Sequence, residues 1–218
     1  PADGARRCTP VSVAAHSFYE KSHPTRMEGP GIALDVSGCR FIDLGAGRVR
    51  VEGSRMGKVP YTIKLEGAEA SGYRTFVLAG IRDPLLIARL DEVETAVEAS
   101  VRAYYRDVPM EDVQIGFVHY GIDGVMGELE PTPVPGHEVG LMMEVIAPTQ
   151  EQADAVCASL RSTYLPYGYP GRKATAGNPV LPFAPRHVSF GPVYRVSVYH
   201  LMAGGDSLRF LSAETMEA

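Results

Sequence analysis

The chain has 218 residues, of which 45% are apolar and 22% are charged, a composition typical of a globular protein rather than a disordered or fibrous one. The net charge of −5 and the lack of a basic run argue against nucleic-acid binding. No apolar stretch approaches the roughly 20 residues of a membrane-spanning helix, and no signal-peptide pattern opens the chain, so we expect a soluble, cytoplasmic protein with no membrane partner.

The first segment, residues 1–33, predicts an extended arm. It contains prolines and glycines but no sustained apolar period, so only one short strand is expected, near Val11–Ala15. Because the chain starts at Pro1 rather than at methionine, we expect it to be a piece of a longer or processed protein. The arm carries a polar cluster that either is solvated or reaches a neighbouring domain: His16, Tyr19, Glu20, Lys21 and His23.

The next region, residues 34–71, predicts a β-hairpin and one additional strand. Apolar and polar residues alternate over Ala33–Leu44 and Arg48–Arg55 around Gly45-Ala46-Gly47. This pattern is typical of two antiparallel strands joined by a short glycine turn. Tyr61–Glu66 predicts the additional strand.

A strand and a long helix follow from residue 72. Gly72–Ile81 predicts the strand, and Asp83-Pro84 supplies an N-cap carboxylate and a first-turn proline for a helix that runs to about Tyr105. Apolar residues recur at helical spacing and predict one buried face: Leu86, Leu90, Val93, Val97, Val101 and Tyr104. Charged residues are expected on the opposite face: Glu92, Glu94, Glu98 and Arg102.

Two further strands are predicted, over Val113–Tyr120 and Glu138–Ile146, with a Gly/Pro-rich loop from Gly121 to Gly136 between them. On the second of these strands apolar side chains alternate to both faces, which suggests burial on both sides. Residues on one face are Val139, Leu141, Met143 and Val145, and those on the other are Met142 and Ile146.

A second helix is predicted from Thr149 to just before Pro166, with Thr149 and Gln152 forming a capping box. Its buried stripe is expected to be Ala153, Val156, Cys157, Leu160 and Tyr164. The long loop 166–191 then leads to a last strand, Val193–Leu201.

The order of these elements, β-α-β-β-α-β, predicts an α+β domain over residues 72–202 and a tail over 203–218. This order is that of the ferredoxin-like, split β-α-β sheet, with two helices on one face. Right-handed crossovers then bring three connections to one edge of the sheet. They are Ile81–Asp83 and the loops 121–137 and 166–191.

The last of these loops combines glycines, cations, a hydroxyl and an amide, as an anion cradle requires. Glycine lets backbone N–H groups approach an oxyanion, and an arginine can bind it through two nitrogens. The candidate binding residues are Arg82, Asp83, Tyr120, Arg172, Lys173, Thr175 and Asn178. The alternative is a surface loop whose cations are solvated or paired with acids.

Two histidines near the same edge, His119 and His137, are the candidate catalytic residues for proton transfer. The alternative for each is a hydrogen-bonded structural histidine. With Glu138 they form a geometrically possible metal site, but no H-x-x-x-H or H-x-H spacing supports one, so we expect no metal and no other cofactor. His200 is expected to be structural.

The three cysteines, Cys8, Cys39 and Cys157, are widely spaced and are expected to be core thiols. No G-x-S-x-G motif, no serine with an attendant base and no cysteine beside a histidine is visible, so covalent hydrolase chemistry is unsupported. Lys64 and Glu66 share one strand face and are expected to form an ion pair with each other or with Arg74.

Four segments resemble the acyclic terpene utilisation protein A (AtuA-like) family: residues 15–31, 60–87, 166–185 and 191–202. The resemblance implies catabolism of branched or unsaturated organic acids and their CoA thioesters, and it assigns no catalytic residue. Usual members also carry an N-terminal glycine-rich α/β domain. The resemblance therefore implies that this chain is the C-terminal portion and that a longer or second chain supplies the rest.

Two hypotheses follow for the function. The first is an enzyme domain that hydrates, dehydrates or isomerises an anionic small molecule or CoA thioester, with cations and a helix N-terminus stabilising an enolate beside a base. The second is a non-catalytic assembly module, packed on a second chain or in a homo-oligomer.

Overall fold

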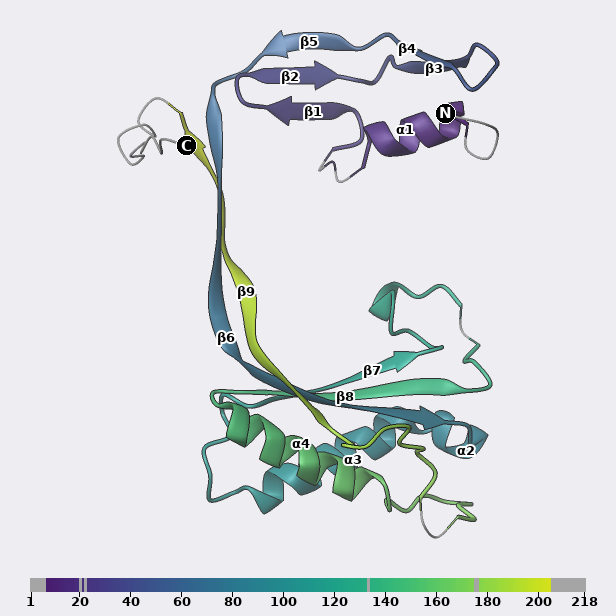
Figure 1. Ribbon diagram of the computed structural model, residues 1–218, viewed down its shortest axis with the longest axis vertical. Helices are drawn as coiled ribbons and strands as arrows, with labels where there is room; N and C mark the ends of the chain where they lie inside the picture. The colour runs from purple at the N-terminus through teal and green to yellow at the C-terminus, as the bar shows by residue number, and fades with distance from the viewer. Residues whose placement is uncertain (1–6, 20, 22, 133, 175–176, 205–218) are drawn as a thin grey trace, which may run out of the picture. The chain divides into compact units, whose positions relative to one another are not determined.

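The computed structural model describes residues 7–204 apart from 20, 22, 133, 175 and 176. The described chain falls into two compact units (Figure 1). The first consists of the described residues up to Gly67 and from Ser197 onward, and the second is Ala68–Val196. The predicted tail from residue 205 onward lies outside the described residues.

The first unit begins with helix α1 (Pro10–Ser17), so the strand predicted near Val11–Ala15 is wrong. A reciprocal capping box starts this helix. The Ser12 amide donates to Thr9 Oγ1 at 3.1 Å, and the Thr9 amide donates to Ser12 Oγ at 2.9 Å. These caps, with Pro10 at the first helical position, favour a helix despite its weak apolar periodicity.

Five short strands complete the architecture before β6. Strands β1 (Arg26–Gly29), β2 (Ile32–Asp35) and β5 (Arg55–Lys58) form one antiparallel sheet. Strands β3 (Arg40–Asp43) and β4 (Val49–Glu52) form a separate hairpin. Strand β1 thus lies within the region predicted to be an extended arm.

The predicted hairpin around Gly45-Ala46-Gly47 is confirmed, with Asp43 opposite Val49. Each arm, however, is interrupted near a glycine, at Gly38 and at Gly53. Gly53 has a φ of 94°, and a Cβ there would lie 2.2 Å from the Gly38 carbonyl oxygen. Only glycine permits this close approach of the two chains, which divides the hairpin into two ladders.

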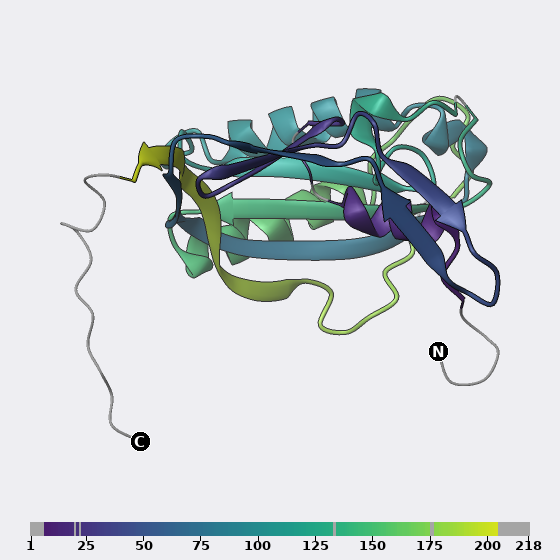
Figure 2. The same ribbon diagram turned by 90° about the horizontal axis from the view of Figure 1, so that it is seen from above.

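The second unit contains a four-stranded sheet in the order β7-β8-β6-β9. Strand β8 (Val139–Ala147) is antiparallel to both β6 (Thr62–Ile81) and β7 (Gln114–Tyr120), and β6 and β8 run side by side (Figure 2). The two strands predicted over 61–66 and 72–81 are one continuous strand, because pairing with β9 (Val188–Ala203) satisfies the backbone between them.

Helices α3 (Leu90–Tyr104) and α4 (Gln150–Tyr164) lie together on one side of this sheet (Figure 1). A short helix α2 (Pro84–Ile87) precedes α3, so the single helix predicted to about residue 105 is divided. A turn of 3₁₀-helix, η1 (Gly127–Leu129), lies in the β7–β8 connection. None of the described helices has the length and apolar character needed to cross a membrane.

The core of this unit forms between the helices and the sheet. Every residue of the stripe predicted on α4 is buried, and so is the stripe predicted on α2 and α3 except Tyr104, which is 76% exposed beyond the edge of the core. On β8, Leu141 and its neighbours on the same face are buried, whereas Met142 and Ile146 on the other face are only half-buried. Within the described residues of this unit, both long helices thus cover the face that carries Leu141.

Only half of the predicted capping box on α4 forms. Thr149 Oγ1 accepts from the Gln152 amide at 3.2 Å. The Gln152 side chain instead donates to the Pro109 carbonyl at 2.9 Å, and so connects α4 to the turn after α3. Pro109 is distant in sequence from Gln152, so the local sequence pattern did not predict this hydrogen bond.

Candidate functional site

Contacts between distant segments confirm that two of the three predicted connections, Ile81–Asp83 and the loop 166–191, meet at one edge of the sheet. Asp83 Oδ2 accepts from the Tyr169 hydroxyl at 2.7 Å and from Asn178 Nδ2 at 3.1 Å. Gly80 and Val180 exchange two backbone hydrogen bonds of 2.8 Å. The 166–187 loop is thereby bound to the end of β6 and the start of α2.

Three hollows surround this edge. The sheet-face hollow, about 590 Å³, lies over the end of β6 and includes Arg82, Glu138 and Asn178 in its lining. The edge hollow, about 580 Å³, is lined by Arg82, the start of α2 and residues 135–137. The helix-side hollow, about 410 Å³, includes His119. Arg82 lines the first two, and Ile87, Ala88 and Pro135 line the last two, so neighbouring hollows share walls.

The edge hollow has the charge expected of an anion site. Arg82 and His137 are its titratable lining residues, and none of the lining residues is a carboxylate. Arg82 is exposed and has no ion pair or hydrogen bond within the described part of the chain. Its guanidinium is therefore available to bind a carboxylate or phosphate through two nitrogens.

His119 is held between two carboxylates at the wall of the helix-side hollow. Its Nε2 lies 2.8 Å from Glu94 Oε1, and its Nδ1 lies 3.4 Å from Asp123 Oδ1. The side chains of His119 and Glu94 are only 12% and 8% exposed. The hydrogen bond to Glu94 raises the pKa of His119, while burial raises the pKa of Glu94. Both shifts favour retention of a proton by the pair.

Glu94 is the functional candidate that the sequence prediction missed, because it was assigned to the charged face of its helix. The structure buries it at 6% exposure. Its spacing relative to Leu90, Val97 and Val101 places it on the apolar stripe of α3. A carboxylate within the apolar stripe of a helix indicates a buried polar partner, and this signal was present in the sequence.

A family model described as acyclic terpene utilisation family protein AtuA matches residues 2–189 of the chain. The chain belongs to this family. Membership confirms the resemblance and connects the chain with acyclic terpene utilisation. No curated protein and no solved structure gives a significant match.

In this AtuA family chain, the predicted residues divide between the two faces of the sheet. His119 faces the helices, as its contact with Glu94 on α3 shows. Tyr120, the next residue on β7, is 49% exposed and faces the opposite side. Asp83 is occupied as the N-cap of α2, since Oδ1 accepts from the Leu85 amide at 2.9 Å. Asn178 lines the sheet-face hollow while it donates to Asp83.

Arg172 contacts its own loop. Its guanidinium donates to the carbonyls of Pro166, Tyr167 and Ala174, at 3.0 Å in the case of Tyr167. This arrangement holds the loop in shape, and the predicted anion contact of Arg172 stays a prediction. Lys173 is exposed and lines none of the three hollows, and Thr175 lies outside the described residues.

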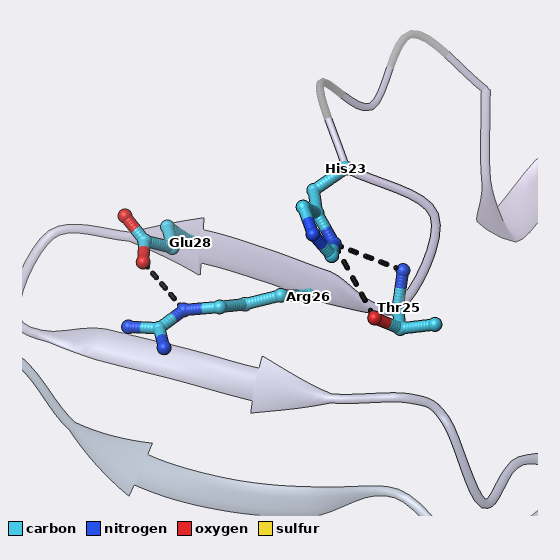
Figure 3. Close-up of polar contacts among 4 residues, drawn as sticks. All are labelled: His23, Thr25, Arg26 and Glu28. Carbon is cyan, nitrogen blue, oxygen red and sulfur yellow. Dashed lines mark hydrogen bonds and ion pairs between the residues drawn. The ribbon is translucent and has the colours of Figure 1, made fainter.

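Of the polar cluster predicted in the arm, His16, Tyr19, Lys21 and His23 are described and exposed, and Glu20 lies outside the described residues. His23 Nδ1 accepts from the Thr25 amide at 3.2 Å, and Arg26 Nε lies 2.6 Å from Glu28 Oε1 (Figure 3). All four residues in these contacts are exposed. The ion pair predicted between Lys64 and Glu66 is confirmed, with 2.5 Å between Nζ and Oε1.

Of the cysteines, only Cys157 is a core thiol, and burial raises its pKa to about 12. Cys8 is exposed and Cys39 is half-buried, so the prediction of core thiols is wrong for these two. Both belong to the first unit, whereas Cys157 belongs to the second. Among the described residues, no group of histidine, cysteine and acidic side chains is arranged to hold a metal ion.

The His119–Glu94 pair predicts a pH dependence of stability. A pKa raised on folding stabilises the protein fully below the unfolded value, about 6.5 for histidine, and this contribution is lost as pH rises through the folded value. The groups that face the pair are Asp123, Asp91 and Tyr164. We expect the wild type to exceed His119→Gln in free energy of unfolding by more at about pH 6 than at about pH 9. Urea unfolding at both pH values measures this, and an equal difference would contradict it.

Proposed function

We propose that this chain contributes an acid–base site that hydrates, dehydrates or isomerises an anionic organic acid or its CoA thioester without a cofactor. The observation that supports this most is the nearly buried His119–Glu94 pair, of which His119 lines a hollow beside the edge hollow. Proton transfer needs a titratable group held in position near the reacting atoms. Buried His–Glu pairs also occur as structural ion pairs, but the adjoining cationic hollow favours a site.

The roles follow from position. Arg82 and His137 would bind the carboxylate, or a phosphate of the CoA group, in the edge hollow. His119, in its charged form, would give a proton to the carbon next to the carbonyl. In hydration a water molecule would supply the hydroxyl group to the following carbon, and the remaining proton of that water would return to the neutral ring; dehydration is the reverse. Glu94 fixes the imidazole and favours its charged form, and Asp123 contacts the other ring nitrogen. A positive group beside a developing enolate lowers its free energy.

We also propose that the second unit has the ferredoxin-like fold. When its strands are numbered along the chain, the sheet order is 2-3-1-4, with both longer helices on one face. That order supports a split β-α-β arrangement. In this fold the β6–α2, β7–β8 and α4–β9 connections share one edge, and residues of all three connections line the sheet-face and edge hollows, which supports the proposal.

Replacement of Arg82 tests the proposed anion site. With α,β-unsaturated CoA thioesters as substrates, Arg82→Gln is expected to raise KM by about 10-fold or more, because a charged hydrogen-bond donor is lost. Loss of the enoyl absorbance measures turnover. Arg106→Gln is the matched control, since Arg106 is 79% exposed and lines none of the hollows. Equal KM values for the two variants would contradict the proposed role.

A second candidate function, an assembly module, is favoured by the edge strand β9. Its apolar side chains Tyr194 and Val196 are 66% and 72% exposed. Exposed apolar edge strands readily pair with another chain. If β9 mediates a homo-oligomer, Val196→Lys is expected to reduce the native mass to that of a single chain. An unchanged native mass would exclude this strand as the interface.

A further inference from the structure

A second cavity lies next to the sheet-face hollow along the face of β6 that carries Phe76 and Leu78. This cavity, about 140 Å³, has a lining that is apolar except for Arg186: Phe76, Leu78, Leu181, Phe183, Pro185 and Val188. Leu78 also lines the sheet-face hollow. The two spaces therefore follow one another along β6, from Arg82 past Leu78 to Phe76.

The floor of the sheet-face hollow is bare backbone at Gly80 and Gly140. Gly80 lies opposite Gly140 in the β6–β8 ladder, and a Cβ at Gly80 would meet no atom within 4 Å. The Gly80 N–H and C=O are both bonded to Val180, so the floor has no unpaired backbone group there. Apolar groups such as methylenes can lie on this floor without desolvating an unpaired polar atom.

The lining residues give the space along β6 one charged end and one uncharged end. Val180 and Pro182 cover the middle. At the β6 end, Arg82 separates the sheet-face hollow from the edge hollow. Glu138 lines only the sheet-face side. An anionic group is therefore favoured on the edge-hollow side of Arg82, and an uncharged chain on the Gly80 side.

We propose that the substrate is an amphiphile with one anionic head between Arg82 and His137 and an aliphatic chain along Gly80, Leu78 and Phe76. This inference rests on the proposed function and specifies its substrate class. From residue 82 to residue 76 a strand rises about 20 Å. The site thus favours long-chain over short-chain acids.

Calorimetric titration of the full chain with butyrate, hexanoate, octanoate and decanoate tests the proposal. The affinity is expected to rise by up to about fourfold for each methylene buried. Gly80→Val should remove this chain-length dependence. Gly168→Val is the matched control, because a Cβ there also meets nothing within 4 Å and Gly168 lines none of these spaces. Gly140→Val provides a second block should the first variant not fold.

Equal affinities for butyrate and decanoate would overturn the inference, as would a Gly80→Val variant that retains the chain-length dependence. Because binding is measured directly, the two proposals can fail separately. Chain-length dependence without thioester turnover would support this inference and count against the proposed reaction. Thioester turnover with no chain-length dependence would support the proposed reaction and overturn this inference. No binding of any carboxylate would overturn both.

Discussion

Replacement of His119 by glutamine is expected to lower kcat by about 10²- to 10⁴-fold, the usual contribution of a positioned general acid or base. Glutamine retains a polar group beside Glu94 but does not transfer protons at neutral pH. Steady-state turnover of the thioester that the wild type converts best gives the measurement. His200→Gln is the matched control, since His200 is exposed on β9 and is expected to retain full activity.

Replacement of Glu94 distinguishes a catalytic role of the His119–Glu94 pair from a purely structural one. Because Glu94 raises the pKa of His119, Glu94→Gln is expected to move the His119 limb of the pH–rate profile to lower pH. A merely structural partner would lower the free energy of unfolding without moving this limb. If His119→Gln keeps wild-type kcat, the proposed acid–base role is wrong.

Replacement of Asp83 by alanine is expected to destabilise the second unit by about 3 kcal/mol. The variant loses the N-cap of α2 and leaves two donors, the Tyr169 hydroxyl and Asn178 Nδ2, without their charged acceptor. Burial and the carboxylate of Asp83 raise the pKa of Tyr169 to about 12. Because Asp83 holds the 166–187 loop at the sheet edge, KM should rise as well. Urea unfolding gives the free energy.

Two variants control this experiment. Asp35→Ala also removes an aspartate that accepts two local hydrogen bonds, both from Ser37, but at an exposed site, so a much smaller effect is expected. Asp83→Asn preserves an acceptor for the Leu85 amide and should fall between Asp83→Ala and the wild type. Similar losses for Asp35→Ala and Asp83→Ala would show that Asp83 does not connect the two segments.

The sheet and its helices were predictable because their signals are local and repeated. The stripe on α4 and the alternation on β8 specify period and facing directly. The first unit was less predictable. The helix α1 depends on two short side-chain caps, and the break in the hairpin depends on the approach of Gly53 to Gly38. Neither the caps nor the glycine contact alters the spacing of apolar residues, so the sequence pattern did not reveal them.

The candidate site was predictable in place more than in detail. Connection order alone located the edge where Asp83 meets Tyr169 and Asn178. It did not specify that Arg172 would bind carbonyls of its own loop. Nor did it specify that Glu94 would turn inward to His119. Both outcomes depend on partners that only the folded chain brings together.

The two units are not successive along the chain, and this bears on the order in which they form during synthesis. The second unit, Ala68–Val196, is one uninterrupted stretch, whereas the first draws on both sides of it. Within the first unit, Tyr61 accepts a hydrogen bond from the Gly204 amide at 2.7 Å, and Gly67 packs on Val198. A ribosome releases Val198 and Gly204 after the whole of the second unit. The sheet that carries the three hollows can therefore be complete while the first unit still awaits the end of β9.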